Sequence, residues 1–271
     1  MSLITITHNY GSNGIDVARN VAQELGWKLF DDRELQELIR QRGIAPKEID
    51  QLDEKAPGFW DSFFRSRPQV FLNVLESVIY DVARTGDGVI IGHGSQVLLR
   101  HFDCAFHVRL FSPESRRVND LAARQGLSRE TALKWIRKHD REQAGFFKFA
   151  FQLDMDDAGL YDLIINTQKF DAGTAAGLVI SAARSEGIRT CSLNVIESME
   201  RLSLEKKIHA ALIENRIDPG SILVEVSEKG VTHLAGFSPN DEEKKRVESI
   251  VGRVPGVAKV VSGVGVIKGG L

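Results

Sequence analysis

The residues best suited to chemistry form a glycine-bearing turn near the start of the chain. An apolar strand is expected at Leu3–Ile6 and a helix at Ile15–Leu25. Backbone N–H groups in such a turn, together with the positive end of the following helix, bind anions such as phosphate. The sequence therefore predicts a phosphate-binding site whose residues are Tyr10, Gly11, Ser12, Asn13, Gly14, Ile15 and Asp16.

This turn keeps the frame of a phosphate-binding loop but not its reactive groups. The full pattern is Gly, any four residues, Gly, Lys and then Ser or Thr. Gly14 supplies the second glycine, whereas Asn9, Ile15 and Asp16 replace the first glycine, the lysine and the hydroxyl residue. Two interpretations stay open: a phosphate cradle, or a strand-to-helix turn that needs Gly14 only for its geometry.

A second candidate group is rich in arginine. Basic residues outnumber acidic ones between Arg109 and Lys148, on two expected helices at 114–125 and 128–143. Guanidinium groups on a mobile lid neutralise phosphate charge in phosphoryl transfer. Arg117, Arg124 and Arg141 are the candidate cations, and Asp140 could orient a hydroxyl or a guanidinium. The alternative is a solvated helix surface with ordinary ion pairs.

Three further polar residues follow predicted strands. His93 stands between Gly92 and Gly94, directly after the buried strand Val89–Ile91, and could be a catalytic base or a loop residue. Asp32 and Arg33 follow a short apolar segment at 27–30 and begin a helix, where an aspartate is first of all an N-cap.

The elements that position these residues alternate between strand and helix for about the first 185 residues. Further strands are expected at 104–111 and 161–166, and further helices at 69–85 and 172–185. This alternation predicts an α/β fold with a parallel sheet, whose ligands lie at the carboxyl ends of the strands. The Gly11–Gly14 turn and the Gly92–Gly94 turn both fall at such ends.

The pattern changes after Gly187. A linker is expected at 187–198, followed by helix, strand, strand, helix and strand up to residue 267. This αββαβ order predicts a small α+β domain at 199–271. The segment has no cluster of residues with metal-ligand spacing, so we expect it to bind a partner or to support assembly.

Composition restricts the function further. The net charge of −2 argues against a general nucleic-acid-binding role, which requires a basic surplus. The first residues lack the pattern of a signal peptide, and no apolar run reaches the roughly 18 residues of a membrane span. The sequence therefore predicts a cytoplasmic protein with no transmembrane segment and no protein-bound metal.

Several short motifs together resemble the cytidylate-kinase-like family, a branch of the P-loop nucleoside monophosphate kinases. They are YGSNGIDVAR, the helix start DREL, VIIGHG, FHVRLFSPESRRV and the segment from DREQAGFFKF to LYDLIINT. The resemblance covers about residues 3–185. It implies a P-loop kinase-type parallel sheet flanked by helices at 1–186, with a nucleoside monophosphate-binding insertion at 32–85 and a lid at 112–150.

The resemblance also implies residue roles. The family transfers the γ-phosphate of ATP, bound with Mg²⁺, to CMP or dCMP. The nucleotide would contact residues 10–16, and the lid residues Arg117, Arg124, Asp140 and Arg141 would be catalytic. The acceptor would contact a set of five residues: Asp32, Arg33, Gly92, His93 and Gly94.

The chain departs from the family pattern at three cations. Ile15 replaces an arginine or lysine, His93 replaces an arginine, and Gln143 replaces the lid arginine of an Asp-x-x-Arg pattern. These departures favour a nucleotide-binding protein with weak or no phosphoryl transfer. Two alternatives remain: an active kinase that uses substitute cations with ATP and Mg²⁺, or a scaffold that binds no nucleotide.

The C-terminal segment resembles a BON domain through VEVSEKGVTHLAGF, EEKKRVESIV and VPGVAKVVSGV. Such domains are associated with phospholipid or membrane-surface binding and with protein association. The resemblance implies a phospholipid, a protein or a small ligand as the partner of this domain, and it leaves a homo-oligomer open. Beside a kinase-like core, the segment is interpreted as a sensory or assembly module.

Overall fold

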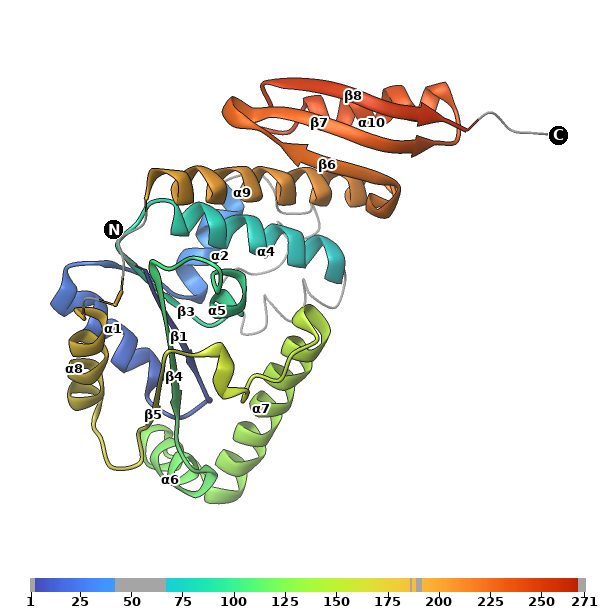
Figure 1. The fold of residues 1–271 in the computed structure, drawn as a ribbon. Helices are drawn as coiled ribbons and strands as arrows, with labels where there is room; N and C mark the ends of the chain where they lie inside the picture. Colours follow the sequence, from blue (N-terminus) through green and yellow to red (C-terminus); the bar gives the residue numbers. More distant parts are fainter. Residues whose placement is uncertain (1–2, 42–66, 186, 189–191, 268–271) are drawn as a thin grey trace. The chain divides into compact units, whose positions relative to one another are not determined.

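The first sheet follows directly from the short apolar runs of the sequence. The computed structural model describes residues 3–41, 67–185, 187–188 and 192–267. Five strands pair in parallel in the order β2-β3-β1-β4-β5 (Figure 1). Their bounds are β1 Leu3–His8, β2 Lys28–Phe30, β3 Gly88–Ile91, β4 Ala105–Phe111 and β5 Leu163–Asn166. The predicted α/β fold is confirmed.

The two faces of this sheet differ in chemistry. Ile4 and Ile6 of β1 belong to an apolar core with helices α1, Gly14–Leu25, and α8, Ala172–Ala183. Thr5 points to the opposite face, where its hydroxyl lies 2.8 Å from Nδ1 of buried His107 on β4. Because side chains alternate along a strand, Leu3 and Thr7 share this face with Thr5, so polar and apolar side chains are buried there together.

Helices α6, Glu114–Gln125, and α7, Arg129–Phe151, form a helical hairpin after β4. Ser128 caps α7 by accepting a hydrogen bond from the amide of Thr131. The predicted helix was expected to end at about Gln143, but α7 continues to Phe151. Edge-to-face contacts among Phe146, Phe147 and Phe151 stabilise this extension.

The predicted insertion at 32–85 is described only at its two ends. Helix α2 spans Asp32–Gln41 and helix α4 spans Pro68–Ala83. Residues 42–66 of the insertion lie outside the described residues. The shorter elements after β3 are α5, Ser95–Leu98, and the 3-10 turn η1, Ala158–Leu160.

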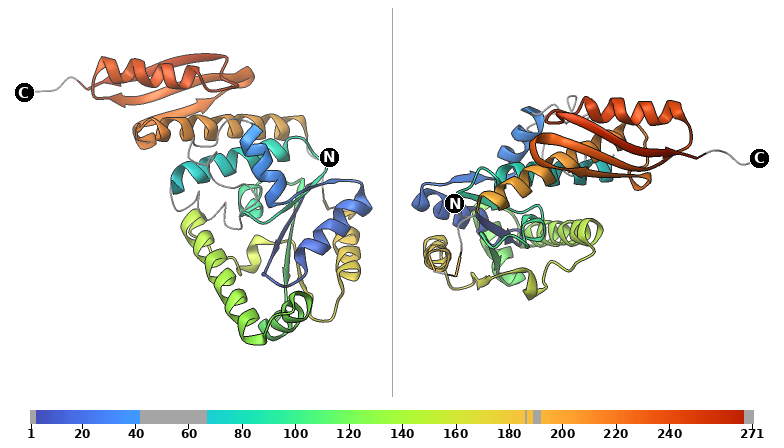
Figure 2. Two further views of the ribbon diagram at one scale, coloured as in Figure 1. Left: turned by 180° about the vertical axis from the view of Figure 1, so that it is seen from behind. Right: turned by 45° about the horizontal axis from the view of Figure 1, so that its top comes forward.

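The C-terminal segment has the predicted αββαβ order (Figure 2). Strand β7 pairs antiparallel with β6 and parallel with β8. Val247 and Val251 of α10 pack with Leu204 and Ile208 of α9 in the core of this domain. The bounds are α9 Leu193–Glu214, β6 Ile222–Val226, β7 Val231–Ser238, α10 Asp241–Gly252 and β8 Lys259–Val266, with 3-10 turns η2 Pro219–Ser221 and η3 Glu228–Gly230.

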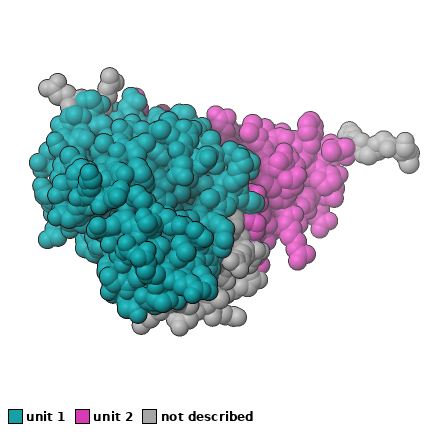
Figure 3. Space-filling model, turned by 90° about the horizontal axis from the view of Figure 1, so that it is seen from below, with its two compact units in different colours: residues 1–35, 85–192 teal, residues 36–84, 193–271 magenta. Residues whose placement is uncertain are grey.

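The chain divides into two compact units, residues 1–35 with 85–192 and residues 36–84 with 193–271 (Figure 3). Helix α4 therefore belongs with α9 and the small sheet. The expected linker at 187–198 overlaps the first turns of α9, which begins at Leu193. Among the helices of the described residues, none has the length and apolar character needed to cross a membrane.

Candidate functional site

The turn between β1 and α1 is held closed by one carbonyl group. The Asn9 carbonyl oxygen accepts hydrogen bonds from the Ser12 amide at 3.1 Å and the Ser12 hydroxyl at 2.7 Å. Gly14 is required here, because a Cβ at this position would lie 2.3 Å from Cγ of His8. The first amides of a helix have no acceptor within that helix, so the start of α1 keeps the capacity to bind an anion.

The side chains of this turn do not add the positive charge that phosphate binding uses. Ile15, at the position of the family cation, is 47% exposed. Asp16 forms an ion pair with Arg19 at 2.8 Å, and Nη1 of Arg124 lies 3.9 Å from its other carboxylate oxygen. The turn therefore offers backbone donors without a cation from its own sequence.

Asp32 and His93, two of the expected acceptor-binding residues, are brought together. Asp31 caps α2 by accepting a hydrogen bond from the Glu34 amide, which leaves Asp32 to contact Nε2 of His93 at 2.6 Å. Desolvation by the surrounding protein disfavours the charged carboxyl, but the charge and hydrogen bond of His93 outweigh it and lower the pKa of Asp32. The pair places an anion and a polarisable imidazole at the carboxyl end of β3.

The turn that carries His93 is conformationally unusual. Gly92, His93 and Gly94 all have positive φ, at 77°, 57° and 69°. Gly94 has no room for a side chain, because a Cβ there would lie 2.1 Å from the Phe151 ring at the end of α7. A histidine in the left-handed region, between two left-handed glycines, is a local strain of the kind found at functional sites.

The guanidinium of Arg117 forms its hydrogen bonds with groups of the protein itself. Its guanidinium forms two hydrogen bonds to the Asp140 carboxylate, both 2.9 Å, and also donates to the carbonyls of Tyr10 at 3.0 Å and Ser112 at 2.9 Å. Only 7% of its side chain is exposed. Arg117 therefore fixes the α6–α7 hairpin to the turn between β1 and α1, and Asp140 serves as its counter-ion.

The remaining hairpin residues contact the turn or solvent. Tyr10 stacks on His139 at 4.2 Å between ring centroids, and Gln143 donates a hydrogen bond to the His8 carbonyl at 3.0 Å. Nη2 of Arg124 lies 3.4 Å from the Gly11 carbonyl oxygen, whereas Arg141 is exposed on α7. Gln143, at the position of a family cation, therefore holds the turn through a neutral contact.

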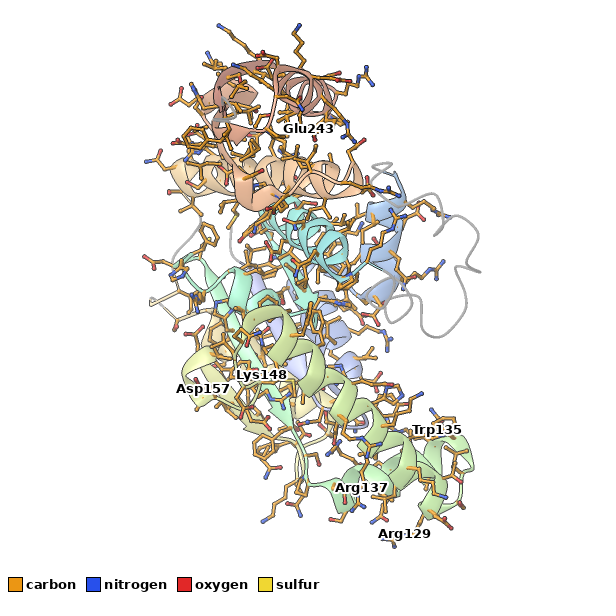
Figure 4. The ribbon with its side chains drawn as sticks, turned by 90° about the vertical axis from the view of Figure 1, so that its right-hand side faces the viewer. Arg129, Trp135, Arg137, Lys148, Asp157 and Glu243 are labelled. Atoms are coloured by element: carbon orange, nitrogen blue, oxygen red, sulfur yellow. The ribbon has the colours of Figure 1, made fainter. Side chains whose placement is uncertain are left out.

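The outer surface of the hairpin fits the alternative of a solvated helix. Arg129, Trp135 and Arg137 extend from the first half of α7, and Lys148 extends from its second half (Figure 4). Arg137 forms an exposed ion pair with Glu114 at 2.9 Å. Arg33, expected at the acceptor, is likewise exposed on α2.

Sequence reasoning missed Arg109, which lies on β4 at the polar face of the sheet. Its Nη2 donates to Oδ1 of Asn9 at 3.1 Å and to Oδ1 of Asp156 at 2.7 Å. Burial lowers the pKa of His8, and the charge of Arg109 lowers it further. An arginine within the apolar run CAFHVRLF was the available signal, because a charged residue in a buried strand requires a partner.

Taken together, polar groups surround the turn between β1 and α1. Backbone donors of α1 and the guanidinium of Arg109 are groups of the kind that bind anions. Within the described ranges, no group of three or more His, Cys, Asp or Glu side chains is placed to hold a metal ion.

A parallel sheet of this order, with a glycine-bearing turn under a helical hairpin, defines an α/β protein of the P-loop kinase type. The sequence profile of the cytidylate kinase-like family matches residues 3–169, more than half of the chain. The chain belongs to this family. The profile of the BON domain matches residues 202–268, so the predicted second family is also confirmed.

Individual relatives agree with this assignment. The chain is 25% identical to a cytidylate kinase of Methanothrix thermoacetophila over 184 residues, 68% of this chain and 98% of that protein. It is 26% identical to a cytidylate kinase of Ignicoccus hospitalis over 169 residues, 62% of this chain and 90% of that protein. A crystal structure of an uncharacterized protein from Eubacterium ventriosum matches with a TM-score of 0.54 at 20% identity, over 67% of this chain and 97% of that one.

Proposed function

We propose that this protein binds a nucleotide of the ATP or CMP type at the carboxyl edge of its first sheet and transfers phosphate weakly or not at all. The observation that carries the proposal is exposed Ile15 at the start of α1, where a side-chain cation would otherwise meet the phosphates. A cation there neutralises charge that develops during transfer, so its loss affects catalysis more than binding.

Binding is supported by groups that remain. The first amides of α1 face the turn, and the Asp32–His93 pair, 2.6 Å apart, lies at the end of the neighbouring strand β3. A relative of the chain is a cytidylate kinase, which supports a nucleotide as the ligand at this edge of the first sheet. Substrates of the family reaction, ATP with Mg²⁺ and CMP, are therefore the first ligands to test.

We further propose that nucleotide binding is linked to the BON domain through α4. Lys207 of α9 contacts the buried carboxylate of Asp81 on α4 at 2.8 Å, and the Ser203 hydroxyl donates to the Ser77 carbonyl at 3.0 Å. Because α4 ends the expected acceptor-binding insertion, a ligand that displaces α4 would also displace the residues of α9 that contact it. A cytoplasmic sensory module would use this connection.

A cavity in the second unit supports a small polar ligand as the partner of this module. Its volume is about 570 Å³, within the usual range for small-molecule sites. Asp81 and Arg84 of α4, Lys207 of α9 and Lys229 of η3 contribute to its lining. Acidic and basic groups are mixed around it, which favours a polar ligand over a lipid tail.

Calorimetric titration of the full chain with ATP and Mg²⁺, with CMP, and with both together tests the proposal, beside a product assay on the same samples. Binding without formation of ADP and CDP supports it. Rapid turnover would favour the alternative of an active kinase with substitute cations. Absence of binding to every nucleotide would favour a scaffold that keeps only the fold.

A further inference from the structure

The guanidinium of Arg109 is buried and only partly satisfied. The residue is 3% exposed and stands opposite Thr7 of β1 in the sheet, near the point where β1 enters the phosphate turn. Its Nη2 carries both hydrogen bonds of the head group, to Asn9 and Asp156. Its Nη1 is buried and has no hydrogen-bond partner among the described residues.

Such an arrangement needs an explanation, because an arginine that leaves water must replace its hydration with hydrogen bonds and counter-charge. The counter-charge here is Asp156, whose side chain is 73% exposed. Water around this carboxylate screens its attraction for the buried guanidinium. Arg109 therefore holds positive charge that the protein neutralises incompletely.

The charge of Arg109 lies next to the proposed phosphate-binding turn, to which Asn9 connects it. Asn9, which shares Nη2 with Asp156, is the first residue after β1, and its carbonyl organises the turn through Ser12. Arg109 also lowers the pKa of His8, so its field reaches the residue that precedes the turn. The cation that is absent from the turn at Ile15 is thus present on the neighbouring strand.

We propose that Arg109 is the phosphate-binding cation of this site: its guanidinium, with a donor free on Nη1, binds a phosphate oxygen of the ligand and replaces the missing cation at Ile15. Asp156 is a displaceable counter-ion that occupies the guanidinium when no phosphate is bound. The ligand class is a phosphate ester or polyphosphate, as in a nucleotide. This inference rests on the proposed function, because it concerns the same site.

The opposing interpretation is that the Arg109–Asp156 pair only ties β4 to the connection between α7 and η1. The two interpretations differ in the effect of Asp156→Asn. If the pair is structural, this change has no effect on anion binding or weakens it through loss of order. If Asp156 competes with phosphate, removal of its charge makes anion binding tighter.

The experiment is calorimetric titration of the full chain with pyrophosphate and with ATP, using wild type, Arg109→Gln, Arg109→Lys and Asp156→Asn. Arg137→Gln, which removes an exposed arginine from α7, is the matched control. We expect Arg109→Gln to weaken binding at least tenfold, Arg109→Lys to restore part of it, and Asp156→Asn to tighten it about threefold, with no change in the control. Circular dichroism checks that each variant is folded.

The outcomes separate this inference from the proposed function. If the wild type, Asp156→Asn and the Arg109 variants all bind ATP with the same affinity, the role of Arg109 is overturned and the proposed nucleotide binding is not. Wild type that binds neither pyrophosphate nor any nucleotide overturns both. Because Asp156 is exposed, Asp156→Asn decides the question even if Arg109→Gln fails to fold: unchanged or weaker pyrophosphate binding by this variant would contradict the role of Arg109.

Discussion

Nε2 of His93, in the turn after β3, lies 2.6 Å from Oδ1 of Asp32, in the first turn of α2. The contact joins two residues far apart in the chain, and it is asymmetric: 13% of the His93 side chain is exposed, against 69% for Asp32. The histidine therefore provides a fixed partner, and the carboxylate faces the solvent from which a substrate would arrive.

This contact predicts how Asp32 titrates. Since His93 holds the pKa of Asp32 below its ordinary value, the pair stabilises the fold above about pH 4, the pKa of an unfolded aspartate, and this contribution is lost as pH falls through the lower folded pKa. We expect His93→Gln to raise the pKa of Asp32, measured by carboxyl carbon NMR. An unchanged titration curve would show that the contact does not persist in solution.

Two ion pairs between α6 and α7 provide a matched test of burial. Asp140→Asn should lower the free energy of unfolding by about 2 kcal/mol, because Arg117, 7% exposed, then holds a buried charge without a counter-charge. Glu114→Gln breaks the exposed pair with Arg137 and should cost much less. Urea unfolding of both variants measures the difference, and equal costs would refute the structural role assigned to Arg117.

Restoring the family cation should strengthen phosphate binding. Ile15 is exposed at the first turn of α1, so Ile15→Lys adds charge without disturbing the core. We expect ATP to bind about tenfold more tightly, equivalent to about 1.4 kcal/mol. Leu223→Lys, at another exposed apolar position, adds the same charge away from the turn and is the control. Equal affinities of the two variants would mean that this turn binds no phosphate.

The buried tyrosine of α4 predicts a transition in alkaline solution. Burial, helped by Glu76 and Glu205, raises the pKa of Tyr80 from 10.0 to about 12. The folded state therefore keeps a proton that the unfolded state loses, so stability should fall as pH rises through this window.

Tyr80→Phe should reduce this dependence of unfolding free energy on pH. Urea unfolding at several alkaline pH values measures the slope, and ultraviolet absorbance follows tyrosine ionisation directly. Ionisation of Tyr80 near its ordinary pKa of 10.0 would contradict its burial.

Elements whose signal is local could be predicted from the sequence. The apolar run Val89–Ile91 and the hairpin of β6 and β7 were both expected and are confirmed. The end of α7 was not, because the helix was expected to stop at about Gln143 and continues to Phe151. Contacts of Phe151 with other aromatic rings and with Gly94 stabilise the longer helix, and no local pattern shows such contacts.

The candidate site was predictable in its backbone and less so in its side chains. The glycine turn and the proximity of Asp32 to His93 follow from the rule that parallel strands end at one edge. The ion pair between Arg117 and Asp140 could not be predicted, because residue type and spacing do not show which arginine side chain is buried. Arg109 was hidden for the same reason, as its partners lie far away in the chain.

Helix α9 begins at Leu193, before the BON domain match at residue 202, and it is continuous through that boundary to Glu214. Its early turns bury Met199 and Ser203 beside α4, and its later turns bury Ile208 and Leu212 in the BON core. A protein fragment that ends just before residue 202 would therefore interrupt α9 and expose the surface of α4 that α9 covers.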